Sequence, residues 1–293
     1  YQGRAACINC QHCVGFACPS DSKNGTHNTL IPRALATGRC ELVTGAMVER
    51  IDTDSDGRVI GVSYYDANDQ RHSPRAAAVV CSAGAIETAR LLLNSRSAQH
   101  PDGLGNQNDQ VGRNLQGHYS PGKFGLMPEQ VYDGIGPGVS AATTHFNHGN
   151  DGLVGGGMLA NEFIVLPIIF WARSLPPDLP RWGAENKRFM RENYTRVIRI
   201  TGPVQEITSA DARVTLDPRV RDRWGIPVAR LSGATHPETV RTAAFMGERA
   251  EEWLRAAGAT RTWGRAGRSS RGTCCRAWCT TWWPGSTSPP RTA

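Results

Sequence analysis

The sequence has no long hydrophobic run. Its longest apolar stretch, Phe163 to Trp171, is nine residues long and contains Pro167, whereas a membrane-spanning helix needs about 20 apolar residues. No apolar segment with a positively charged flank, as in a signal peptide, opens the chain, and its first residue is Tyr1 instead of Met. We therefore expect no transmembrane segment, and the start at Tyr1 indicates that an N-terminal part is missing.

Outside the last 30 residues, basic and acidic residues are nearly balanced in number. The formal net charge is +7, but residues 264–293 contain five arginines and no acidic residue, and the rest of the chain holds 28 Lys and Arg against 26 Asp and Glu. A nucleic-acid-binding surface gathers basic residues on one face of the protein. The composition of the body therefore predicts no nucleic-acid partner.

The terminal segment 264–293 also lacks Leu, Ile, Val, Met and Phe, although it contains three Trp and three Cys. No helical or strand period runs through it. Its mixture of Arg, Gly, Ala, Pro, Trp, Cys and Ser is typical of a GC-rich gene translated in a shifted frame. We hypothesise that the homologous sequence ends near Trp263 and that this tail is aberrant; a genuinely disordered basic tail is the alternative.

Cysteine is too infrequent for a disulfide scaffold, but four of the nine cysteines lie close together as Cys7-x2-Cys10-x2-Cys13-x4-Cys18-Pro19. The bacterial ferredoxin pattern C-x2-C-x2-C-x3-C-P has a last gap that is one residue shorter. Zinc sites use C-x2-C pairs that normally lie apart along the chain. An iron–sulfur cluster, another metal site and a loop of reduced thiols all stay open; reduced thiols favour a cytoplasmic location.

Strands and helices alternate through the rest of the chain, which predicts a mixed α/β fold. Residues 46–53 and 58–65 are β-rich and flank Asp54-Ser55-Asp56-Gly57, a sequence that favours a hairpin turn. Residues 76–81 are small and apolar, as in a buried strand, and an amphipathic helix is predicted over 86–93. A second amphipathic helix is predicted from His236 through Leu254.

The turn Ser82-Ala83-Gly84-Ala85 joins the predicted strand 76–81 to the helix that follows. Small residues let a main chain approach a cofactor closely, and the N-terminus of a helix favours negative charge. Many strand-to-helix connections use Ala-Gly for packing alone. Cofactor contact and simple packing both remain open from this feature.

Several segments, in this order and spacing, resemble the glucose–methanol–choline (GMC) oxidoreductase family, and within it the gluconate dehydrogenase-like flavoproteins. The resemblance covers about residues 5–263. Its segments include Cys13-x4-Cys18-Pro19 with Lys23-Asn24-Gly25-Thr26, Ala46-Met47-Val48-Glu49-Arg50-Ile51, Ser82-Ala83-Gly84-Ala85-Ile86-Glu87-Thr88-Ala89-Arg90-Leu91-Leu92, Val111-Gly112-Arg113-Asn114-Leu115 and Ala212-Arg213-Val214-Thr215-Leu216-Asp217-Pro218.

The resemblance implies an FAD-dependent enzyme that oxidises an alcohol or sugar hydroxyl by hydride transfer to flavin, with electrons passing to an acceptor protein. Val48 would offer its backbone to the adenine, and Ala83 and Gly84 would lie against the dinucleotide. His118 is expected to fasten the loop after Asn114. The implied fold is an incomplete FAD-binding Rossmann-like domain with a mixed-sheet substrate domain.

The same resemblance implies a division of the chain. Residues 1–118 would form a partial FAD-binding domain with the Cys-rich loop. Residues 119–204 would form the substrate-domain sheet, and residues 205–263 would begin the C-terminal segment of the family. Residues 264–293 would be the aberrant tail.

Two departures from the family pattern leave the catalytic residues unknown. The family's G-x-G-x-x-G turn, which holds a pyrophosphate at a helix N-terminus, occurs nowhere in the sequence. Where the family's catalytic His is expected, the chain reads Ser269-Ser270-Arg271-Gly272-Thr273. Two alternatives therefore stay open: an iron–sulfur electron-transfer module through Cys7, Cys10, Cys13 and Cys18, and a non-functional translated fragment.

Overall fold

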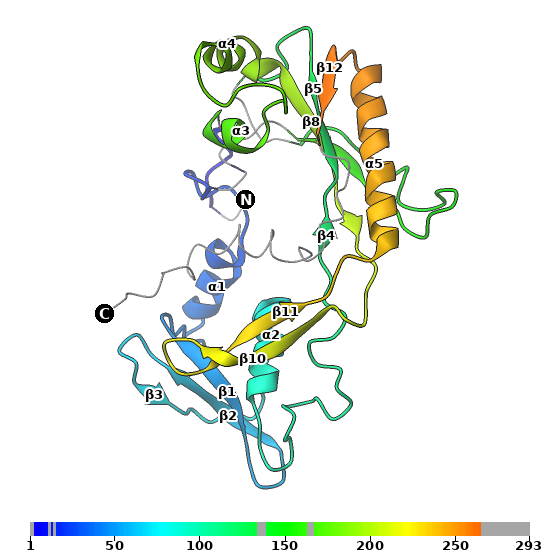
Figure 1. The fold of residues 1–293 in the computed structure, drawn as a ribbon. Coiled ribbons are helices and arrows are strands. Elements are labelled where there is room, and N and C mark those ends of the chain that lie inside the picture. Colours follow the sequence, from blue (N-terminus) through cyan, green and yellow to red (C-terminus); the bar gives the residue numbers. More distant parts are fainter. Residues whose placement is uncertain (1–2, 11–12, 14–15, 134–138, 163–166, 265–293) are drawn as a thin grey trace. The chain divides into compact units, whose positions relative to one another are not determined.

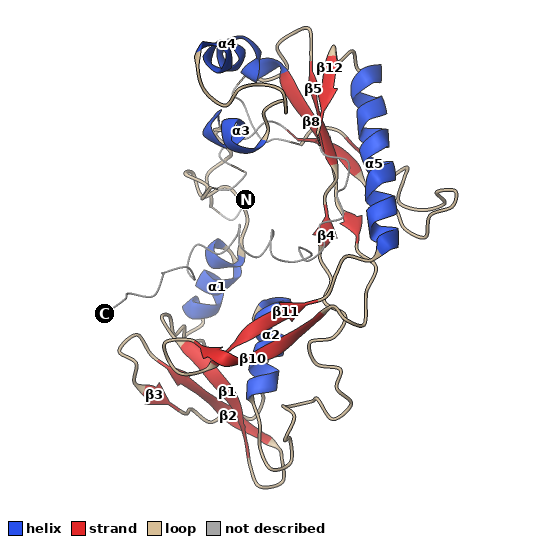
Figure 2. Ribbon diagram, viewed as in Figure 1, coloured by secondary structure: helices blue, strands red, loops and turns tan. Residues whose placement is uncertain are grey.

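The computed structural model describes the whole chain except residues 1–2, 11–12, 14–15, 134–138, 163–166 and 265–293 (Figure 1). Helices and strands are interspersed along the sequence (Figure 2), which confirms the predicted mixed α/β class. The hypothesis about the tail and the segment beginning at Ser269 lie outside the described residues. Within the described ranges, no helix is both long and apolar enough to span a bilayer.

The described chain contains five α-helices, two short 3-10 helices and twelve strands. The helices are η1 Thr26–Asn28, α1 Leu30–Ala36, α2 Gly84–Asn94, α3 Pro167–Arg173, α4 Ala184–Asn193, η2 Tyr194–Arg196 and α5 Pro237–Ala256. The strands are β1 Met47–Thr53, β2 Val59–Tyr65, β3 Arg71–His72, β4 His118–Tyr119, β5 Gly122–Leu126, β6 Ala142–Thr143, β7 Leu159–Glu162, β8 Val197–Thr201, β9 Val204–Gln205, β10 Arg213–Arg221, β11 Pro227–Ser232 and β12 Arg261–Trp263.

The chain divides into two compact units, each built from segments that are separate in sequence. Of the described residues, the first unit takes those up to Cys40, His118–Ile207 and those from Pro237 to Gly264; the second takes Glu41–Gly117 and Thr208–His236. No finding tests the sequence-based division at residues 118, 204 and 263, so it stays a prediction.

The second unit begins with the predicted hairpin. β1 and β2 pair antiparallel, and β3 adds to the far side of β2. The turn closes where Asp54 and Arg58 share a backbone hydrogen bond of 2.9 Å, from the Asp54 N–H to the Arg58 carbonyl oxygen. This confirms the interpretation of the Asp-Gly pair as a hairpin turn.

Helix α2 packs against a second hairpin, formed by β10 and β11. Ala89 and Leu115 are buried there with Ala212 and Val214, and Leu231 packs against this cluster. The helix begins two residues before the predicted start because Gly84 and Ala85 join its first turn. The apolar stripe read from the sequence therefore identified the face of α2 that meets the core.

The first unit is built around an antiparallel sheet of order β12-β5-β8-β7-β6, with α5 along one face (Figure 1). Side chains alternate across β8. Ile200 joins Met246 and Leu254 in the cluster under α5, whereas Val197 joins Phe170 in a cluster on the other face. The predicted second helix is confirmed as α5, whose buried stripe supplies three of the six buried residues of the cluster that contains Ile200.

The strand predicted over residues 76–81 does not form, and every pairing between the described strands is antiparallel. The Ala76 N–H donates to the Ile60 carbonyl oxygen at 2.9 Å, and the chain then leaves β2. A strand needs a neighbour for its backbone hydrogen bonds, and no described strand pairs with residues 77–81. Val80 is consequently 89% exposed.

Candidate functional site

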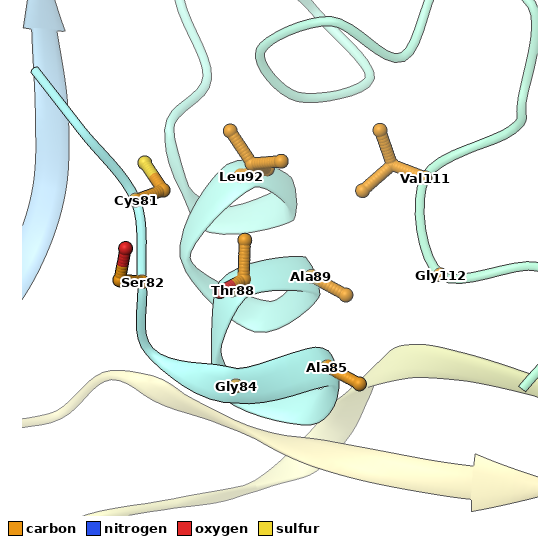
Figure 3. Close-up of a pocket in the computed structure, with 9 residues that line it drawn as sticks. All are labelled: Cys81, Ser82, Gly84, Ala85, Thr88, Ala89, Leu92, Val111 and Gly112. Carbon is orange, nitrogen blue, oxygen red and sulfur yellow. The ribbon is translucent and has the colours of Figure 1, made fainter.

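An open hollow of about 460 Å³ lies beside the N-terminal half of α2. Figure 3 shows its three walls: the extended segment before the helix, one face of α2, and a loop opposite. Its lining residues are Cys81, Ser82, Gly84, Ala85, Thr88, Ala89, Leu92, Val111 and Gly112. All of these residues belong to the second unit.

The first turn of α2 leaves backbone donors open at this hollow. Ala83 is the residue before the helix, and no side chain caps the helix N-terminus. The first N–H groups of an α-helix have no acceptor within the helix and carry a partial positive charge. The Ala83 N–H already donates a hydrogen bond to the Thr88 hydroxyl oxygen at 3.2 Å. The remaining donors suit an anionic or strongly polar group.

Gly84 has two properties that a larger residue would lose. Its φ of +79° lies in the left-handed region, which side chains other than that of glycine rarely adopt. A Cβ added at this position would find no heavy atom within 4 Å. The main chain at Gly84 is therefore bare on the side where a side chain would stand, and another molecule can approach it closely.

The opposite wall is held in place by β10. The Val214 N–H donates to the Gly112 carbonyl oxygen at 2.7 Å, and the Leu115 N–H donates to the Ala212 carbonyl oxygen at 2.8 Å. At Gly112 the φ is +81°, and a Cβ there would lie only 2.3 Å from the Val214 carbonyl oxygen. The motif Val111 to Leu115 thus needs glycine at its second position in order to lie on the strand.

A carboxylate fixes the start of the same loop. Asp109 accepts hydrogen bonds from the guanidinium groups of Arg113 and Arg213, the latter at 2.8 Å. These two hydrogen bonds lower the pKa of Asp109 below its ordinary value. The loop that carries Val111 and Gly112 is therefore tied to β10 at both ends.

The hollow combines small residues, two hydroxyl groups and open backbone donors. Ser82 and Thr88 supply the hydroxyl groups. Ala85 and Ala89 carry only methyl side chains, so a ligand can come close to the backbone of the helix. This combination fits the phosphate or ribose portion of a nucleotide cofactor, because such portions need donors and close backbone approach more than deep apolar enclosure. FAD is the cofactor that the sequence implied, and this surface fits part of it.

The predicted cofactor residues fall in two places. Gly84 lines the hollow and Ala83 directly precedes it, whereas Val48 lies on β1 opposite Tyr64 and is not among the lining residues. Val48 is 38% exposed. Their roles in cofactor binding stay predictions. Sequence reasoning missed Thr88 and Leu92 as lining residues, although both lie on the helix face that Ala85 begins.

The Cys-rich loop does not form a metal site in the described chain. Cys7, Cys10, Cys13 and Cys18 have free thiols, and among the described residues no three His, Cys, Asp or Glu side chains are placed to hold a metal ion. An iron–sulfur cluster needs three or four thiolates around one centre, so its assignment to these cysteines stays a prediction.

One thiol of this loop is nevertheless electrostatically distinct. The Cys18 Sγ lies 3.5 Å from the Ser20 hydroxyl, and that hydrogen bond is the largest of the effects that lower the pKa of Cys18 to about 7 from 9.0. Backbone N–H groups, led by that of Lys23, add to the effect.

His118, for which a structural role was expected, lies on β4 and pairs with Gln205 of β9.

Comparison with known proteins identifies relatives of this chain. The profile of the GMC oxidoreductase family matches residues 4–120. The chain is 30% identical over 251 residues to 2-methyl-1,2-propanediol dehydrogenase of Mycolicibacterium austroafricanum, a match covering 83% of this chain and 45% of that protein. It is 26% identical over 251 residues to the gluconate 2-dehydrogenase flavoprotein of Pantoea cypripedii, covering 82% of this chain and 40% of that one.

The chain spans about half the length, or less, of the curated relatives that it matches. Among solved structures, a formate oxidase of Aspergillus oryzae aligns with a TM-score of 0.46 at 17% identity, covering 73% of this chain and 43% of that one.

Proposed function

Because the chain belongs to the GMC oxidoreductase family, we propose that it forms part of an FAD-dependent enzyme that oxidises an alcohol or sugar hydroxyl. The names of its relatives support this substrate class, since they include a propanediol dehydrogenase, a fructose dehydrogenase and a gluconate dehydrogenase. An acceptor protein for the electrons belongs to the same proposal.

The N-terminal turn of α2 carries the proposal. Gly84 presents a bare main chain, the first N–H groups of the helix lie open, and the Ser82 and Thr88 hydroxyl groups flank them. Donors of this kind suit the pyrophosphate and ribose groups of a dinucleotide. The proposal extends to Ala83 in this contact and to Val48 as a backbone contact of the adenine.

When FAD is bound, its flavin supplies the hydride acceptor for oxidation of the hydroxyl carbon. The residues of the hollow have a binding task. The α2 N-terminus would offset the negative charge of the cofactor, and Val111 and Leu92, which line the hollow, would shield one side of it from water. No catalytic residue is assigned.

Titration of the purified chain with FAD tests the proposal. We expect weak but saturable binding, measured by flavin fluorescence anisotropy, with ADP competing and riboflavin not competing. Ala85→Glu places a carboxylate beside the open N–H groups and should weaken binding by about tenfold or more, because like charges at close range repel. Ala67→Glu adds the same charge on an exposed turn of the same unit and should leave binding unchanged.

Two results would contradict the proposal. The first is the absence of saturable FAD binding in a chain whose circular dichroism shows it to be folded. The second is an equal loss of affinity in Ala85→Glu and Ala67→Glu, which would indicate a general charge effect instead of a site at α2. The isolated chain is expected to retain little FAD through purification, so the titration uses added cofactor.

A further inference from the structure

The β10–β11 hairpin carries four exposed arginines, here called the basic hairpin: Arg219 and Arg221 on β10, Arg223 in the turn and Arg230 on β11. Within the described chain, the side chains of Arg219 and Arg230 have neither a hydrogen bond nor an ion pair. Arg221 donates to the Gly225 carbonyl oxygen at 2.8 Å. Most of the guanidinium donors of this group therefore face solvent.

The two acidic residues of the hairpin offset only part of this charge. Asp222 turns inward, where one of its oxygens accepts the Arg90 guanidinium at 2.6 Å. Asp217 accepts the backbone N–H groups of Val220 and Arg219, both at 2.8 Å, and these bonds lower its pKa. The positive charges of Arg230 and Arg219 also lower the pKa of Asp217, so this carboxylate offsets part of the charge of the group. In the described chain, the one ion pair of the group joins Arg223 to Asp69, which lies outside the hairpin, at 3.4 Å.

The side chains between these arginines resemble a protein interface in composition. Val220 is 54% exposed between Arg219 and Arg221. The Arg223 guanidinium stacks on the Trp224 ring at 4.2 Å, which holds both groups in a fixed arrangement. Arginine and tryptophan are the residue types most enriched among the energetic centres of protein–protein interfaces.

We propose that the basic hairpin binds an acidic surface of a partner protein. Charge complementarity selects the partner, because carboxylate groups form paired, charge-assisted hydrogen bonds with guanidinium groups. The exposed Val220 and the stacked Trp224 add apolar contact area that a nucleic-acid backbone would not use.

The position of the basic hairpin gives this docking a structural consequence. β10 and β11 form the surface on which α2 lies, and Arg90 of α2 donates to the Pro227 carbonyl oxygen of β11 at 2.8 Å. A partner held by the hairpin would be attached to the same rigid assembly as the hollow beside α2. The docking proposal itself does not depend on the proposed oxidoreductase function.

Binding of a fluorescently labelled polyglutamate peptide tests the surface. We expect binding at about 0.01 M NaCl that weakens strongly at about 0.1 M, as the Debye length falls from about 30 Å to about 10 Å. The double variant R219E/R230E should reduce affinity by about tenfold or more. The control R58E/R75E makes the same change in charge at two exposed arginines elsewhere in the second unit and should change affinity by less than about twofold.

Three outcomes would overturn the proposal. The first is equal weakening in the two double variants, which would show a net-charge effect. The second is unchanged affinity in R219E/R230E, which would place the binding elsewhere. The third is tighter binding of a DNA duplex or of anionic phospholipid vesicles through the same arginines. If R219E/R230E does not fold by circular dichroism, R219Q/R230Q replaces it in the same comparison.

Discussion

The guanidinium of Arg90 and the carboxylate of Asp222 meet at 2.6 Å across 132 positions of sequence. Both side chains are largely buried, with 9% and 16% of their surfaces exposed. The same guanidinium donates to the Pro227 carbonyl oxygen, and Asp222 also accepts the Trp224 and Ile226 N–H groups. The pair therefore joins α2 to the β10–β11 turn and satisfies both partners.

Removing the carboxylate should destabilise the protein because the buried Arg90 guanidinium would keep only the half-exposed Glu87, at 3.1 Å, as an ionic partner. We expect Asp222→Ala to lower the free energy of unfolding by about 3 kcal/mol, measured by urea denaturation. Asp211→Ala, at an exposed position near the start of β10, is the control and should lie within about 0.5 kcal/mol of wild type. A small effect of Asp222→Ala would mean that the pair does not contribute to stability.

The two glycines beside the hollow should respond differently to alanine. Gly112→Ala combines a left-handed φ with a Cβ only 2.3 Å from the Val214 carbonyl oxygen, so we expect a loss of about 3 kcal/mol. In Gly84→Ala the added Cβ has no heavy atom within 4 Å, so the only cost is that of holding alanine at a left-handed φ. We expect this to lower the free energy of unfolding by about 1 kcal/mol. Thermal unfolding of both variants shows which of them loses more stability. A larger loss in Gly84→Ala than in Gly112→Ala would contradict the close packing of Gly112 on β10.

Glu251 on α5 should stabilise the protein in a pH-dependent way. Hydrogen bonds from Arg255 and Lys123 lower its pKa to about 2 from 4.5. A carboxyl whose folded pKa is depressed stabilises the protein above its unfolded pKa, and this contribution is lost as the pH falls from 4.5 towards 2. Glu251→Gln should therefore destabilise the protein at neutral pH and have little effect in strong acid.

Unfolding midpoints at about pH 6 and about pH 3 measure this difference. Glu248→Gln, at an exposed position on the same helix, serves as the control. We expect the difference between the unfolding midpoints at these two pH values to be smaller in Glu251→Gln than in wild type. In Glu248→Gln this difference should be unchanged. Equal narrowing in both variants would contradict a specific role for the contacts with Arg255 and Lys123.

Cys18 should be the most readily alkylated thiol of the N-terminal loop near neutral pH. Its pKa of about 7 makes it substantially ionised there, and the thiolate is the reactive form. Ser20→Ala removes the largest cause of the shift, so the midpoint of iodoacetamide reactivity against pH should move upward. Ser55→Ala, on an exposed turn, should leave that midpoint in place. Peptide mapping by mass spectrometry assigns the label to each cysteine.

Features determined by local sequence were predicted correctly. The Asp54–Gly57 turn fixes the β1–β2 hairpin through its own hydrogen bonds, and the 3.6-residue period of α2 identifies the face that Ala89 buries. The strand predicted at residues 76–81 failed for the opposite reason. Its composition suits a strand, but a strand exists only when a neighbour shares its backbone hydrogen bonds.

The candidate site was predictable only in part. Ala83 and Gly84 were found because small residues before a helix leave a visible pattern. The opposite wall was not, because the position of Val111 depends on hydrogen bonds between its loop and β10, about 100 residues away. The contact between Arg90 and Asp222 could not be predicted for the same reason, because nothing in the sequence spacing of these two residues indicates that they meet.

The interleaving of the two units determines how the gene can be cut. A clone ending at Gly117 would carry α2 but not the β10–β11 hairpin that covers its buried face, and Ala89 would then face water. A self-sufficient version of the second unit needs residue 117 spliced through a short linker to residue 208. Domain-swap libraries for this chain therefore require paired crossover points, because a single breakpoint between α2 and β10 would separate the helix from the strands that stabilise it.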